Sequence, residues 1–323
     1  MSAYENFAKV KALIEDRRNA AIATADMRNE EVRSLSSIIR EIDDELKTTG
    51  PKILAAACAG EDLEPIKKRN LELMDKRRAE LVRLGLPEDY TEVHYTCKRC
   101  SDSGFIGGVK LCSCFREALT TENIKSSGIG ALIEKQSFEN FNLEIYKNDP
   151  ETYENMQRNL NRAKKFAETI GRVGDAQNLV LIGTTGTGKT HISTAIAKVA
   201  ITRGLYVIYD SAQNIMNDFE TDRFKSGYGP YEPRAEKYLE CDLLIIDDLG
   251  TEFTTPFVIS CLYNLLNTRL NRGLPTVVST NLPLQEISGK YEARICSRLF
   301  GNESTILNFK GNDFRIYQRK KDK

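Results

Sequence analysis

The chain of 323 residues predicts an α/β protein whose C-terminal half holds a parallel sheet, preceded by a helical region and a small four-cysteine module. Two observations carry this prediction. Four of the eight cysteines lie between residues 97 and 114. Downstream, short β-branched runs alternate with helical stretches, which is typical of a parallel sheet covered on both faces. These runs are LVLIG, LYVIYD, LLIIDD, TVVST and TILNF.

Composition narrows the classes of protein that need to be considered. Apolar residues make up 41% of the chain and charged residues 28%, which is the profile of a folded globular protein. Because 46 basic side chains balance 46 acidic ones, nucleic-acid binding would require a local basic patch. The N-terminus lacks the apolar stretch of a signal peptide and no run is long enough to span a bilayer, so we expect a cytoplasmic protein with no membrane partner.

The first part of the chain predicts a helical hairpin. One long amphipathic helix is expected from Ser2 to about Lys47, ended by the TTGP at residues 48–51, and a second from about Leu63 to Leu84, ended by LGLP. Two interpretations stay open: the helices pack only on each other, or they offer an apolar seam to another protein.

The cysteine cluster predicts a structural zinc site. Cys97 and Cys100 form a C-x-x-C pair, and Cys112 and Cys114 form a C-x-C pair. Four thiolates suit a tetrahedral zinc with no open position, and a reducing compartment disfavours disulfides. A redox pair or unligated thiols are the alternatives, and His94 is a further candidate ligand. The other four cysteines are interpreted as small apolar residues.

A glycine-rich segment predicts a phosphate-binding loop. Gly183, Gly188, Lys189 and Thr190 fit the pattern G-x-x-x-x-G-K-[ST] between a predicted strand and a predicted helix. Successive backbone N–H groups would face the phosphates of ATP, Lys189 would reach the β and γ phosphates, and Thr190 would bind magnesium. The candidate nucleotide-binding residues are Gly183, Thr184, Thr185, Gly186, Thr187, Gly188, Lys189, Thr190 and His191.

Three later segments supply further candidate catalytic residues. Asp247 and Asp248 end a buried strand; Asp247 would hold magnesium and Asp248 would orient the attacking water. Asn281 ends the next strand, where its amide would contact the γ-phosphate or the water. Arg294 and Arg298 share one helical face, a spacing suited to presenting guanidinium to a neighbour's nucleotide.

In this order the motifs resemble those of AAA+ ATPases, and more narrowly the DnaC/DnaI group of helicase loaders, with IstB-type transposition helpers as close relatives. The narrower resemblance rests on FENFNLEIY, LLIIDDLGTE, RICSRLF and GNDFR, and it covers about Phe138 to Arg315. It implies an ATPase that loads a hexameric DnaB-type helicase onto single-stranded DNA. A transposition helper that binds a transposase and DNA is the alternative, as is a nucleotide switch with negligible turnover.

The resemblance also implies roles for single residues. Arg298 matches the arginine finger that completes a neighbouring subunit's site, Arg294 its companion, and Arg315 a second sensor. Many AAA+ proteins have Glu as the second Walker B acid where this chain has Asp248, which leaves Glu252 as a rival for positioning water. The chain ends soon after GNDFR, without space for a helical lid, which favours a loader over a replication initiator.

The resemblance to initiator-like AAA+ proteins also implies a contact with single-stranded DNA, because in those proteins a helical element between the phosphate-loop helix and the strand with the two acids makes such a contact. In this chain the segment 210–240 takes that position. It mixes cations with aromatic residues, namely Arg223, Lys225, Tyr228 and Tyr231, although a plain surface insertion is equally compatible with these residues. We expect a helical partner-binding region at 1–95, the zinc module at 96–116, a connector at 117–137 and the AAA+ domain at 138–323. The first two would bind the helicase, and AAA+ units would self-associate through Arg294, Arg298 and the nucleotide site.

Overall fold

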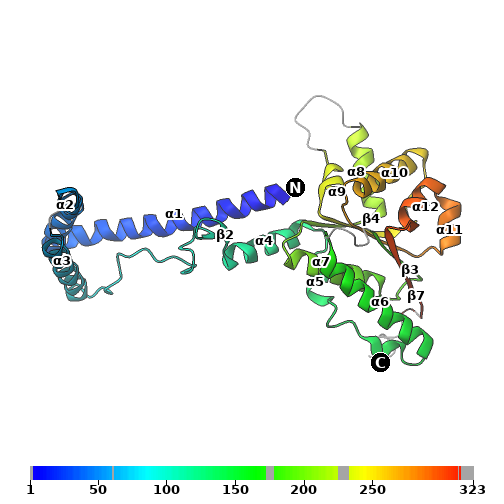
Figure 1. The fold of residues 1–323 in the computed structure, drawn as a ribbon, viewed down its shortest axis with the longest axis horizontal. Coiled ribbons are helices and arrows are strands. Elements are labelled where there is room, and N and C mark those ends of the chain that lie inside the picture. Colours follow the sequence, from blue (N-terminus) through cyan, green and yellow to red (C-terminus); the bar gives the residue numbers. More distant parts are fainter. Residues whose placement is uncertain (1–2, 60–61, 172–177, 225–232, 312, 314–323) are drawn as a thin grey trace. The chain divides into compact units, whose positions relative to one another are not determined.

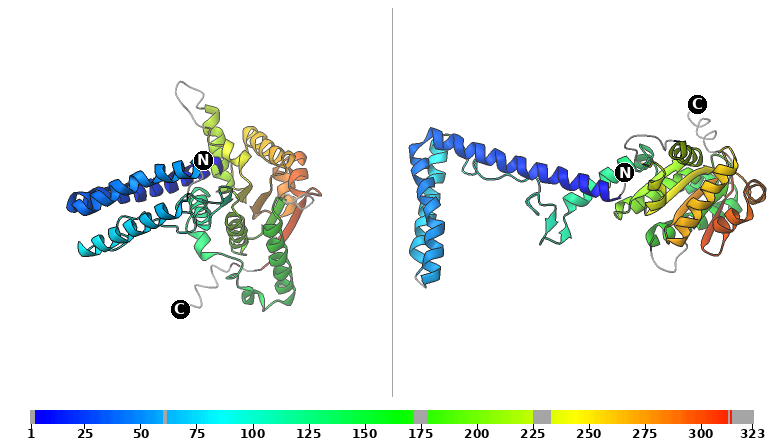
Figure 2. Two further views of the ribbon diagram at one scale, coloured as in Figure 1. Left: turned by 60° about the vertical axis from the view of Figure 1, so that its left-hand side comes forward. Right: turned by 90° about the horizontal axis from the view of Figure 1, so that it is seen from above.

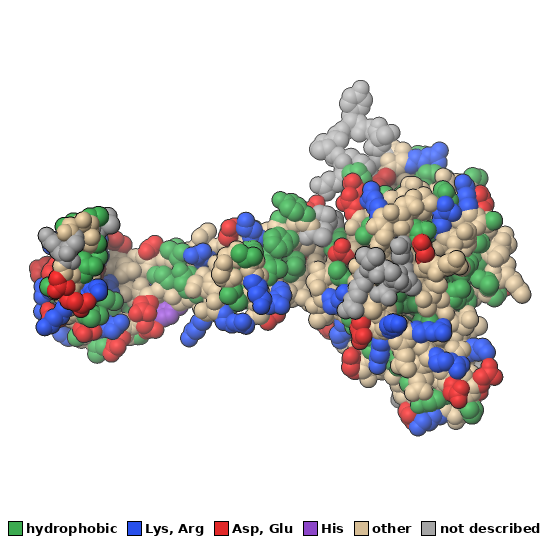
Figure 3. All heavy atoms as spheres, in the orientation of Figure 1, with side chains coloured by type: hydrophobic (Ala, Val, Ile, Leu, Met, Phe, Trp, Pro, Cys, Tyr) green, Lys and Arg blue, Asp and Glu red, His purple; other side chains and the backbone are tan. Residues whose placement is uncertain are grey.

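The computed structural model of the protein describes residues 3–59, 62–171, 178–224, 233–311 and 313 (Figure 1). The chain divides into two compact units. The smaller unit comprises Lys11–Phe115, and the larger combines residues 1–10 with 116–323. Acidic and basic side chains are interspersed over the visible surface of each unit (Figure 3). None of the helices in the described ranges has the length and apolar character needed to cross a membrane.

The smaller unit is built mainly from three helices. α1 spans Ala3–Leu35, with its first residues in the larger unit, α2 spans Ser37–Ala59 and α3 spans Glu64–Arg83. In the smaller unit α2 turns away from the axis of α1, and α3 lies beside α2 (Figure 2). Val32, Ile39 and Leu81 are fully buried where the three helices meet, so each helix contributes to one small apolar core.

The predicted first helix, from Ser2 to about Lys47, is wrong in two respects. The helix breaks at Ser36, whose hydroxyl accepts a hydrogen bond from the N–H of Ile39 (3.3 Å) and donates one to Oε1 of Glu80 (2.8 Å). Ser36 thereby caps α2. The TTGP segment at residues 48–51 does not end a helix, because α2 continues through Pro51 to Ala59. Pro51 removes one intrahelical hydrogen bond, and packing against α3 offsets that loss.

The larger unit contains a five-stranded sheet in the order β4-β5-β6-β3-β7, with every neighbouring pair parallel. The predicted strands are confirmed. They are β3 (Asn178–Gly183), β4 (Val207–Ser211), β5 (Leu243–Leu249), β6 (Thr276–Thr280) and β7 (Ser304–Phe309). Strand β3, which lies between β6 and β7, is almost completely buried, as expected for a strand covered on both faces.

Helices cover both faces of this sheet (Figure 1, Figure 2). One apolar cluster joins α6 and α7 to one face, and a second joins α8, α10 and α12 to the other. Within the described residues the other helices are α4 (Ser113–Ser126), α5 (Leu132–Lys135), the 3₁₀ helix η1 (Leu143–Tyr146), α6 (Pro150–Thr169), α7 (Lys189–Thr202), α8 (Ala212–Phe224), α9 (Glu236–Glu240), α10 (Pro256–Asn271), α11 (Leu284–Lys290) and α12 (Ala293–Phe300). The α/β fold class with a helical N-terminal region is therefore confirmed.

The first turn of α1 is fastened to the end of α4 within the larger unit. Asn6 is fully buried, and its amide nitrogen donates to Oδ1 of Asn123 (2.9 Å) and to Oγ of Ser126 (2.7 Å). Lys9 forms an ion pair with Glu122, which lies on α4 one turn before Ser126. These contacts explain why residues 1–10 belong to the larger unit although 105 residues of the smaller unit follow them.

Candidate functional site

The phosphate-binding loop lies between β3 and α7, as the sequence predicts. Gly188 precedes the first residue of α7 with φ 91°, in the left-handed region. A Cβ atom at this position would lie 3.0 Å from the ring of Phe141, so both conformation and space require glycine. The positive end of α7 faces the loop, which is the arrangement that binds phosphate groups in other proteins.

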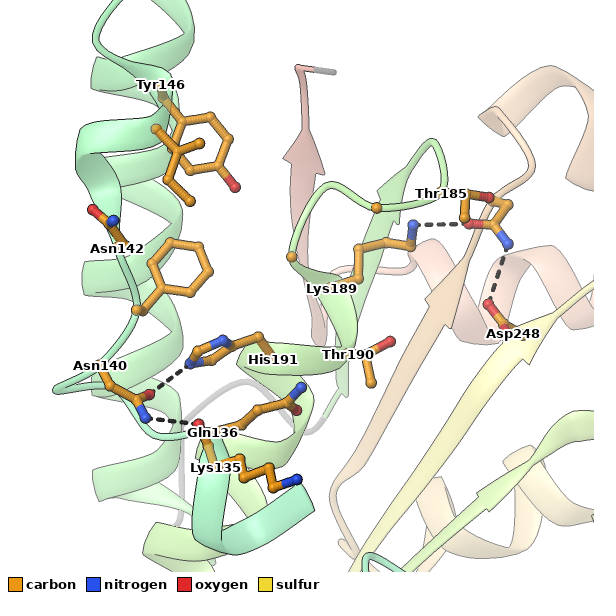
Figure 4. Close-up of a pocket in the computed structure, with 15 residues that line it drawn as sticks. Lys135, Gln136, Asn140, Asn142, Tyr146, Thr185, Lys189, Thr190, His191 and Asp248 are labelled. Atoms are coloured by element: carbon orange, nitrogen blue, oxygen red, sulfur yellow. Dashed lines mark hydrogen bonds between the residues drawn. The ribbon is translucent and has the colours of Figure 1, made fainter. Parts of the chain in front are cut away.

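Three predicted catalytic side chains come together beside this loop. The Nζ atom of Lys189 donates to the carbonyl oxygens of Gly183 (2.6 Å) and Thr184 (2.8 Å) and to Oδ1 of Asn281 (2.8 Å). The amide nitrogen of Asn281 donates in turn to Oδ1 of Asp248 (3.1 Å). Dashed lines in Figure 4 lead along this chain from Lys189 to Asp248. Parallel neighbouring strands end at the same edge of the sheet, which places these residues together.

The two acids at the end of β5 have different surroundings. Asp248 lines the pocket, and its backbone has φ 53°, a left-handed conformation that costs a residue other than glycine about 1 kcal/mol. In Asp247, by contrast, both carboxylate oxygens accept hydrogen bonds from neighbouring strands. Oδ2 accepts one from the hydroxyl of Tyr209 at 2.7 Å, and Oδ1 accepts one from the hydroxyl of Ser279. Sequence analysis missed Tyr209 and Ser279, which lie on the strands flanking β5.

Glu252, the rival of Asp248, is placed away from the pocket. Its side chain is 1% exposed, Oε2 accepts from the N–H of Gly250 (2.9 Å), and Oε1 accepts from the hydroxyl of Tyr291. The ammonium group of Lys290 lies 3.7 Å from Oε1. Both carboxylate oxygens therefore stabilise the loop after β5, and Asp248 is the acid that the structure presents to the pocket.

The phosphate loop opens into a pocket of about 430 Å³ (Figure 4). One wall comes from the SFENFNLEIY segment, which sequence analysis used only for the family resemblance. The hydroxyl of Tyr146 donates to the carbonyl of Thr187 (3.0 Å), and the rings of Phe141 and Tyr146 stack at 6.3 Å. The lining residues are Lys135, Gln136, Asn140, Phe141, Asn142, Ile145, Tyr146, Thr185, Gly186, Gly188, Lys189, Thr190, His191, Asp248 and Asn281.

His191 joins this wall to the helix that follows the phosphate loop. Its Nε2 atom lies 2.8 Å from the carbonyl oxygen of Ser137 and 3.0 Å from Oδ1 of Asn140, so Nε2 carries the proton and donates. The ring meets Phe141 edge-on at 5.1 Å. Burial lowers the pKa of His191, which favours the neutral ring. An aromatic wall with a few amide groups beside a phosphate loop suits a purine base.

The predicted magnesium ligands have suitable chemistry. Thr190 lines the pocket on the first turn of α7, and Asp247 ends β5. A hydroxyl and a carboxylate are hard oxygen donors, which magnesium prefers together with phosphate oxygens and water. The Thr190 side chain lies beside the phenol of Tyr209, whose hydroxyl donates to Oδ2 of Asp247. The two donor groups thus share a neighbour, and the set fits a Mg²⁺–nucleotide complex.

Arg294 and Arg298 lie on α12 and are stacked on one tyrosine. Their guanidinium carbons lie 4.6 Å and 4.5 Å from the centre of the Tyr263 ring. Arg298 also donates to Oδ1 of Asn267 (2.8 Å) and to the hydroxyl of Tyr263 (3.1 Å), while Arg294 pairs with Glu292 (2.7 Å). Among the described residues neither arginine lines the pocket of its own chain.

The four predicted cysteines of the metal module lie together in the smaller unit. Their sulfur atoms are all within 4.8 Å of one another, with Cys97 and Cys112 separated by 3.7 Å and Cys100 and Cys114 by 3.5 Å. A tetrahedral zinc with Zn–S bonds of about 2.3 Å requires sulfur atoms roughly 3.8 Å apart. The cluster therefore fits zinc. The backbone N–H of Cys114 lowers the pKa of Cys112 to about 6, which favours its thiolate.

A short hairpin and a buried acid organise this module. β1 (Phe105–Ile106) and β2 (Lys110–Leu111) pair antiparallel between the two cysteine pairs. Asp102 is fully buried, accepts hydrogen bonds from the N–H groups of Thr96 (2.8 Å) and Cys97 (2.9 Å), and contacts Arg17 of α1 at 2.6 Å. Sequence analysis missed Asp102. His94 is exposed and lies outside the metal cluster of the described residues.

The predicted DNA-contacting insertion corresponds to α8, α9 and the segment between them. Arg223 lies in the last turn of α8, and its guanidinium carbon lies 4.6 Å from the centre of the Phe257 ring at the start of α10. The other predicted residues of this group, Lys225, Tyr228 and Tyr231, lie outside the described residues, as does Arg315.

With the geometry in place, comparison with known proteins identifies the family. A family model described as "IstB-like ATP binding protein" matches residues 142–322, more than half of the chain. The chain belongs to this family. The match includes the phosphate loop, both acids of β5, Asn281 and the arginines of α12. It confirms the resemblance drawn from the sequence motifs.

Several proteins that are similar in sequence to this IstB-like chain have names from DNA replication. The replicative helicase loader DnaC of Escherichia coli strain K12 is 25% identical over 189 residues, covering 58% of this chain and 73% of DnaC. The DnaC of Buchnera aphidicola is 23% identical and covers 60% and 74%. The chromosomal replication initiator DnaA of Campylobacter jejuni strain 81116 is 31% identical over 128 residues, covering 39% of this chain and 28% of DnaA.

Solved structures give a similar set of names. A crystal structure of the DnaC helicase loader is 17% identical, covering 48% of this chain and 90% of that one, with a TM-score of 0.43. A crystal structure of DnaI is 20% identical, covering 58% and 94%, with a TM-score of 0.45.

Proposed function

We propose that this IstB-like protein is an ATP-dependent loader that places a hexameric DnaB-type replicative helicase on single-stranded DNA. The observation that carries the proposal is the chain of contacts from Lys189 through Asn281 to Asp248 beside a phosphate loop, in a protein similar to replicative helicase loaders. These contacts place a cation for phosphate, an amide and a carboxylate for water beside one nucleotide site, and ATP hydrolysis needs all three groups.

In this proposal each residue has a defined task. The triphosphate of ATP lies at the start of α7, its base lies against Phe141 and Tyr146, and Lys189 turns from the carbonyls of the loop toward the phosphates. Magnesium, held by Thr190 and Asp247, supplies charge neutralisation on the phosphates when it is bound. Asp248 accepts a hydrogen bond from the attacking water and orients it, and Asn281 fixes the carboxylate of Asp248.

Self-association completes the proposed ATPase. Arg298 faces the nucleotide of a neighbouring subunit, and the Tyr263 ring holds the guanidinium groups of Arg294 and Arg298 side by side on α12. A guanidinium group supplied by a neighbour stabilises negative charge on the transferring phosphoryl group. Hydrolysis therefore depends on assembly, which links ATP turnover to the formation of a loader complex.

The smaller unit is the proposed helicase-binding part. A groove of about 470 Å³ runs between α2 and α3. Its lining combines four apolar residues, among them Ile38, Ile42 and Leu73, with six charged ones, among them Glu45 and Arg69. A groove that mixes apolar and charged side chains suits an amphipathic segment of another protein. The zinc module, tied to α1 through Asp102 and Arg17, stiffens the same unit.

A capture experiment tests this proposal. The full-length protein is mixed with the replicative helicase of the same organism and with ATP, with and without a strong zinc chelator, and the bound helicase is measured. We expect capture that the chelator abolishes, and loading of the captured helicase onto single-stranded DNA. Absence of capture by the folded, zinc-containing protein would contradict the proposal.

The name of the matching family favours a second candidate function. An IstB-like transposition helper would bind a transposase and double-stranded DNA, and nucleotide would control that complex. The same capture assay, repeated with a transposase encoded beside the gene for this protein, separates the two functions. Capture of the transposase and not of the helicase would select the transposition helper.

The substitution Asp248→Asn distinguishes an ATPase motor from a nucleotide switch. The variant keeps the size of the side chain but removes the carboxylate that orients water, so hydrolysis should stop while ATP still binds. If loading requires hydrolysis, the variant captures the helicase but does not release it onto DNA. Loading that persists without hydrolysis would select the switch.

A further inference from the structure

We propose that Tyr209 is a positioning residue of the magnesium site, and that the chain segment following α4 holds Tyr209 in place. The inference rests on the proposed use of the pocket for Mg²⁺–ATP. Tyr209 lies on β4 and is 9% exposed. Its hydroxyl donates to Oδ2 of Asp247 at 2.7 Å and lies beside the Thr190 side chain, so one phenol adjoins both of the side chains assigned to magnesium.

Strand register explains how Tyr209 reaches Asp247. In the β4–β5 pair Tyr209 lies opposite Ile245, and Ser211 lies opposite Asp247. The Tyr209 side chain therefore extends diagonally to the residue two positions further along β5, a distance that long aromatic side chains span. Ser279 of β6 donates to the other oxygen of Asp247 from the opposite side. Asp247 is held between its two neighbouring strands.

These hydrogen bonds act on the orientation of the Asp247 carboxylate. One donor contacts each oxygen, so the group cannot rotate without breaking a hydrogen bond. Loss of such a supporting contact typically lowers metal affinity 10- to 100-fold. The hydroxyl of Tyr209 is required for this action, and its ring is not.

The backbone of Tyr209 is held from outside the sheet. β4 is an edge strand of the described sheet, and the N–H of Tyr209 donates to the carbonyl oxygen of Ser127 at 2.7 Å. Gly128 has φ +82°, and a Cβ atom there would lie 2.4 Å from the carbonyl oxygen of Tyr209. A side chain at position 128 would therefore have to displace Tyr209 or the segment.

The segment at Ser127 and Gly128 is joined to the beginning of the chain. It follows directly on Ser126, the last residue of α4, whose hydroxyl accepts a hydrogen bond from the buried Asn6 of α1. A shift of these helix ends moves Ser127 and Gly128, which contact the backbone of Tyr209. The hydroxyl of Tyr209 then moves as well, and its hydrogen bond to Asp247 weakens. The magnesium affinity of the site thus depends on how α1 and α4 are seated in the larger unit.

The substitution Tyr209→Phe tests the first part of the inference. Equilibrium binding of a fluorescent, non-hydrolysable ATP analogue is measured while the concentration of Mg²⁺ is varied. We expect the Mg²⁺ concentration at half-maximal binding to rise about tenfold, with unchanged binding when the metal is chelated. Tyr238→Phe is the matched control, because Tyr238 is a buried tyrosine of the same unit whose hydroxyl bonds to Asp210 and Asp218.

Two glycines of one loop test the second part. Gly128 and Gly130 both have left-handed φ values, but a Cβ atom at Gly130 would meet no atom within 4 Å. Gly128→Ala should raise the Mg²⁺ requirement, and Gly130→Ala should not. The double variant of Gly128→Ala with Tyr209→Phe should show no further rise over Tyr209→Phe alone. If Gly128→Ala does not fold, Asn6→Ala replaces it with the same expected direction.

The outcomes separate this inference from the proposed function. If the unmodified protein binds the nucleotide without any dependence on Mg²⁺, or does not bind it, the proposed function and the inference are both overturned. If its binding depends on Mg²⁺ and Tyr209→Phe has the same midpoint as Tyr238→Phe, the inference alone is overturned. If Tyr209→Phe shifts the midpoint while Gly128→Ala behaves like Gly130→Ala, the proposed hold by the segment is wrong.

Discussion

The amide oxygen of Asn281 accepts a hydrogen bond from the ammonium group of Lys189 at 2.8 Å, although 92 residues separate them in the chain. The two residues follow β6 and β3, which are neighbours in the sheet. The same amide group donates to Asp248. Asn281 therefore contacts both the cation and the acid to which the proposed function assigns phosphate binding and water orientation, and its loss should affect turnover more than binding.

Asn281→Ala should slow ATP hydrolysis about 100-fold, the usual cost of removing one positioned polar group from a reaction centre. Nucleotide affinity should change little, because the phosphate loop and the aromatic wall remain. Steady-state turnover and equilibrium binding of an ATP analogue measure the two effects. Asn264→Ala, at an exposed position on α10, is the control. A large loss of affinity in Asn281→Ala would show that the residue serves binding instead.

Arg298→Ala should bind ATP but not hydrolyse it, because its own pocket is intact and the guanidinium it offers to a neighbour is gone. Lys189→Ala should fail to bind ATP while keeping Arg298. Mixing the two inactive variants pairs an intact pocket with an intact arginine, so part of the activity should return. If the mixture stays inactive while both variants still associate, Arg298 does not act across subunits.

Cys97→Ser should abolish zinc binding and destabilise the smaller unit, because a metal held by four thiolates would join the two cysteine pairs of this module. Metal analysis should find one zinc ion per chain in the unmodified protein and none in the variant. Thermal melting followed by circular dichroism should show the loss of helix. Cys58→Ser, at an exposed free cysteine, should keep both the metal and the melting curve.

The contact of Glu80 with Ser36 predicts a pH dependence of stability. Hydrogen bonds from Arg83 and Ser36 lower the pKa of Glu80 from 4.5 to about 2. Because the folded pKa lies below the unfolded one, this contribution is fully present above pH 4.5 and is lost as the pH falls toward 2. Arg83 is exposed, so solvent screens its share of the effect.

Glu80→Gln should therefore melt at a lower temperature than the unmodified protein at pH 7. The difference between the two melting temperatures should shrink as the pH is lowered through 4.5. Glu72→Gln, an exposed carboxylate on the same helix, should show no such difference at either pH. An equal difference at all pH values would mean that the charge of Glu80 does not stabilise the junction of α1 and α2.

Local chemistry explains which parts of the structure could be predicted. The five strands are short apolar runs with polar residues at their carboxyl ends, and the phosphate loop, Asp247, Asp248 and Asn281 all lie at those ends. The four cysteines carry their own signal through their spacing. In each case residues that are close in sequence determine the local structure.

The features that sequence analysis missed depend on distant contacts. The break at Ser36 depends on Glu80, 44 residues away, and a serine within a helical pattern does not show such a partner. Tyr209 and Ser279 contact Asp247 only because β4 and β6 flank β5, an order that the sequence does not state. Asp102 needs the fold of the cysteine module before it can accept hydrogen bonds from Thr96 and Cys97.

The anchoring of Asn6 to α4 changes how the protein unfolds. Residues 1–10 are part of the larger unit, so the smaller unit is an insertion held at both ends. When the smaller unit melts, its residues become a closed loop between two fixed points instead of a free tail. The entropy cost of closing a loop grows only slowly with its length, so the larger unit can stay folded around it. Thermal unfolding should then show two separate transitions, and a single melting temperature would not describe the stability of the whole chain.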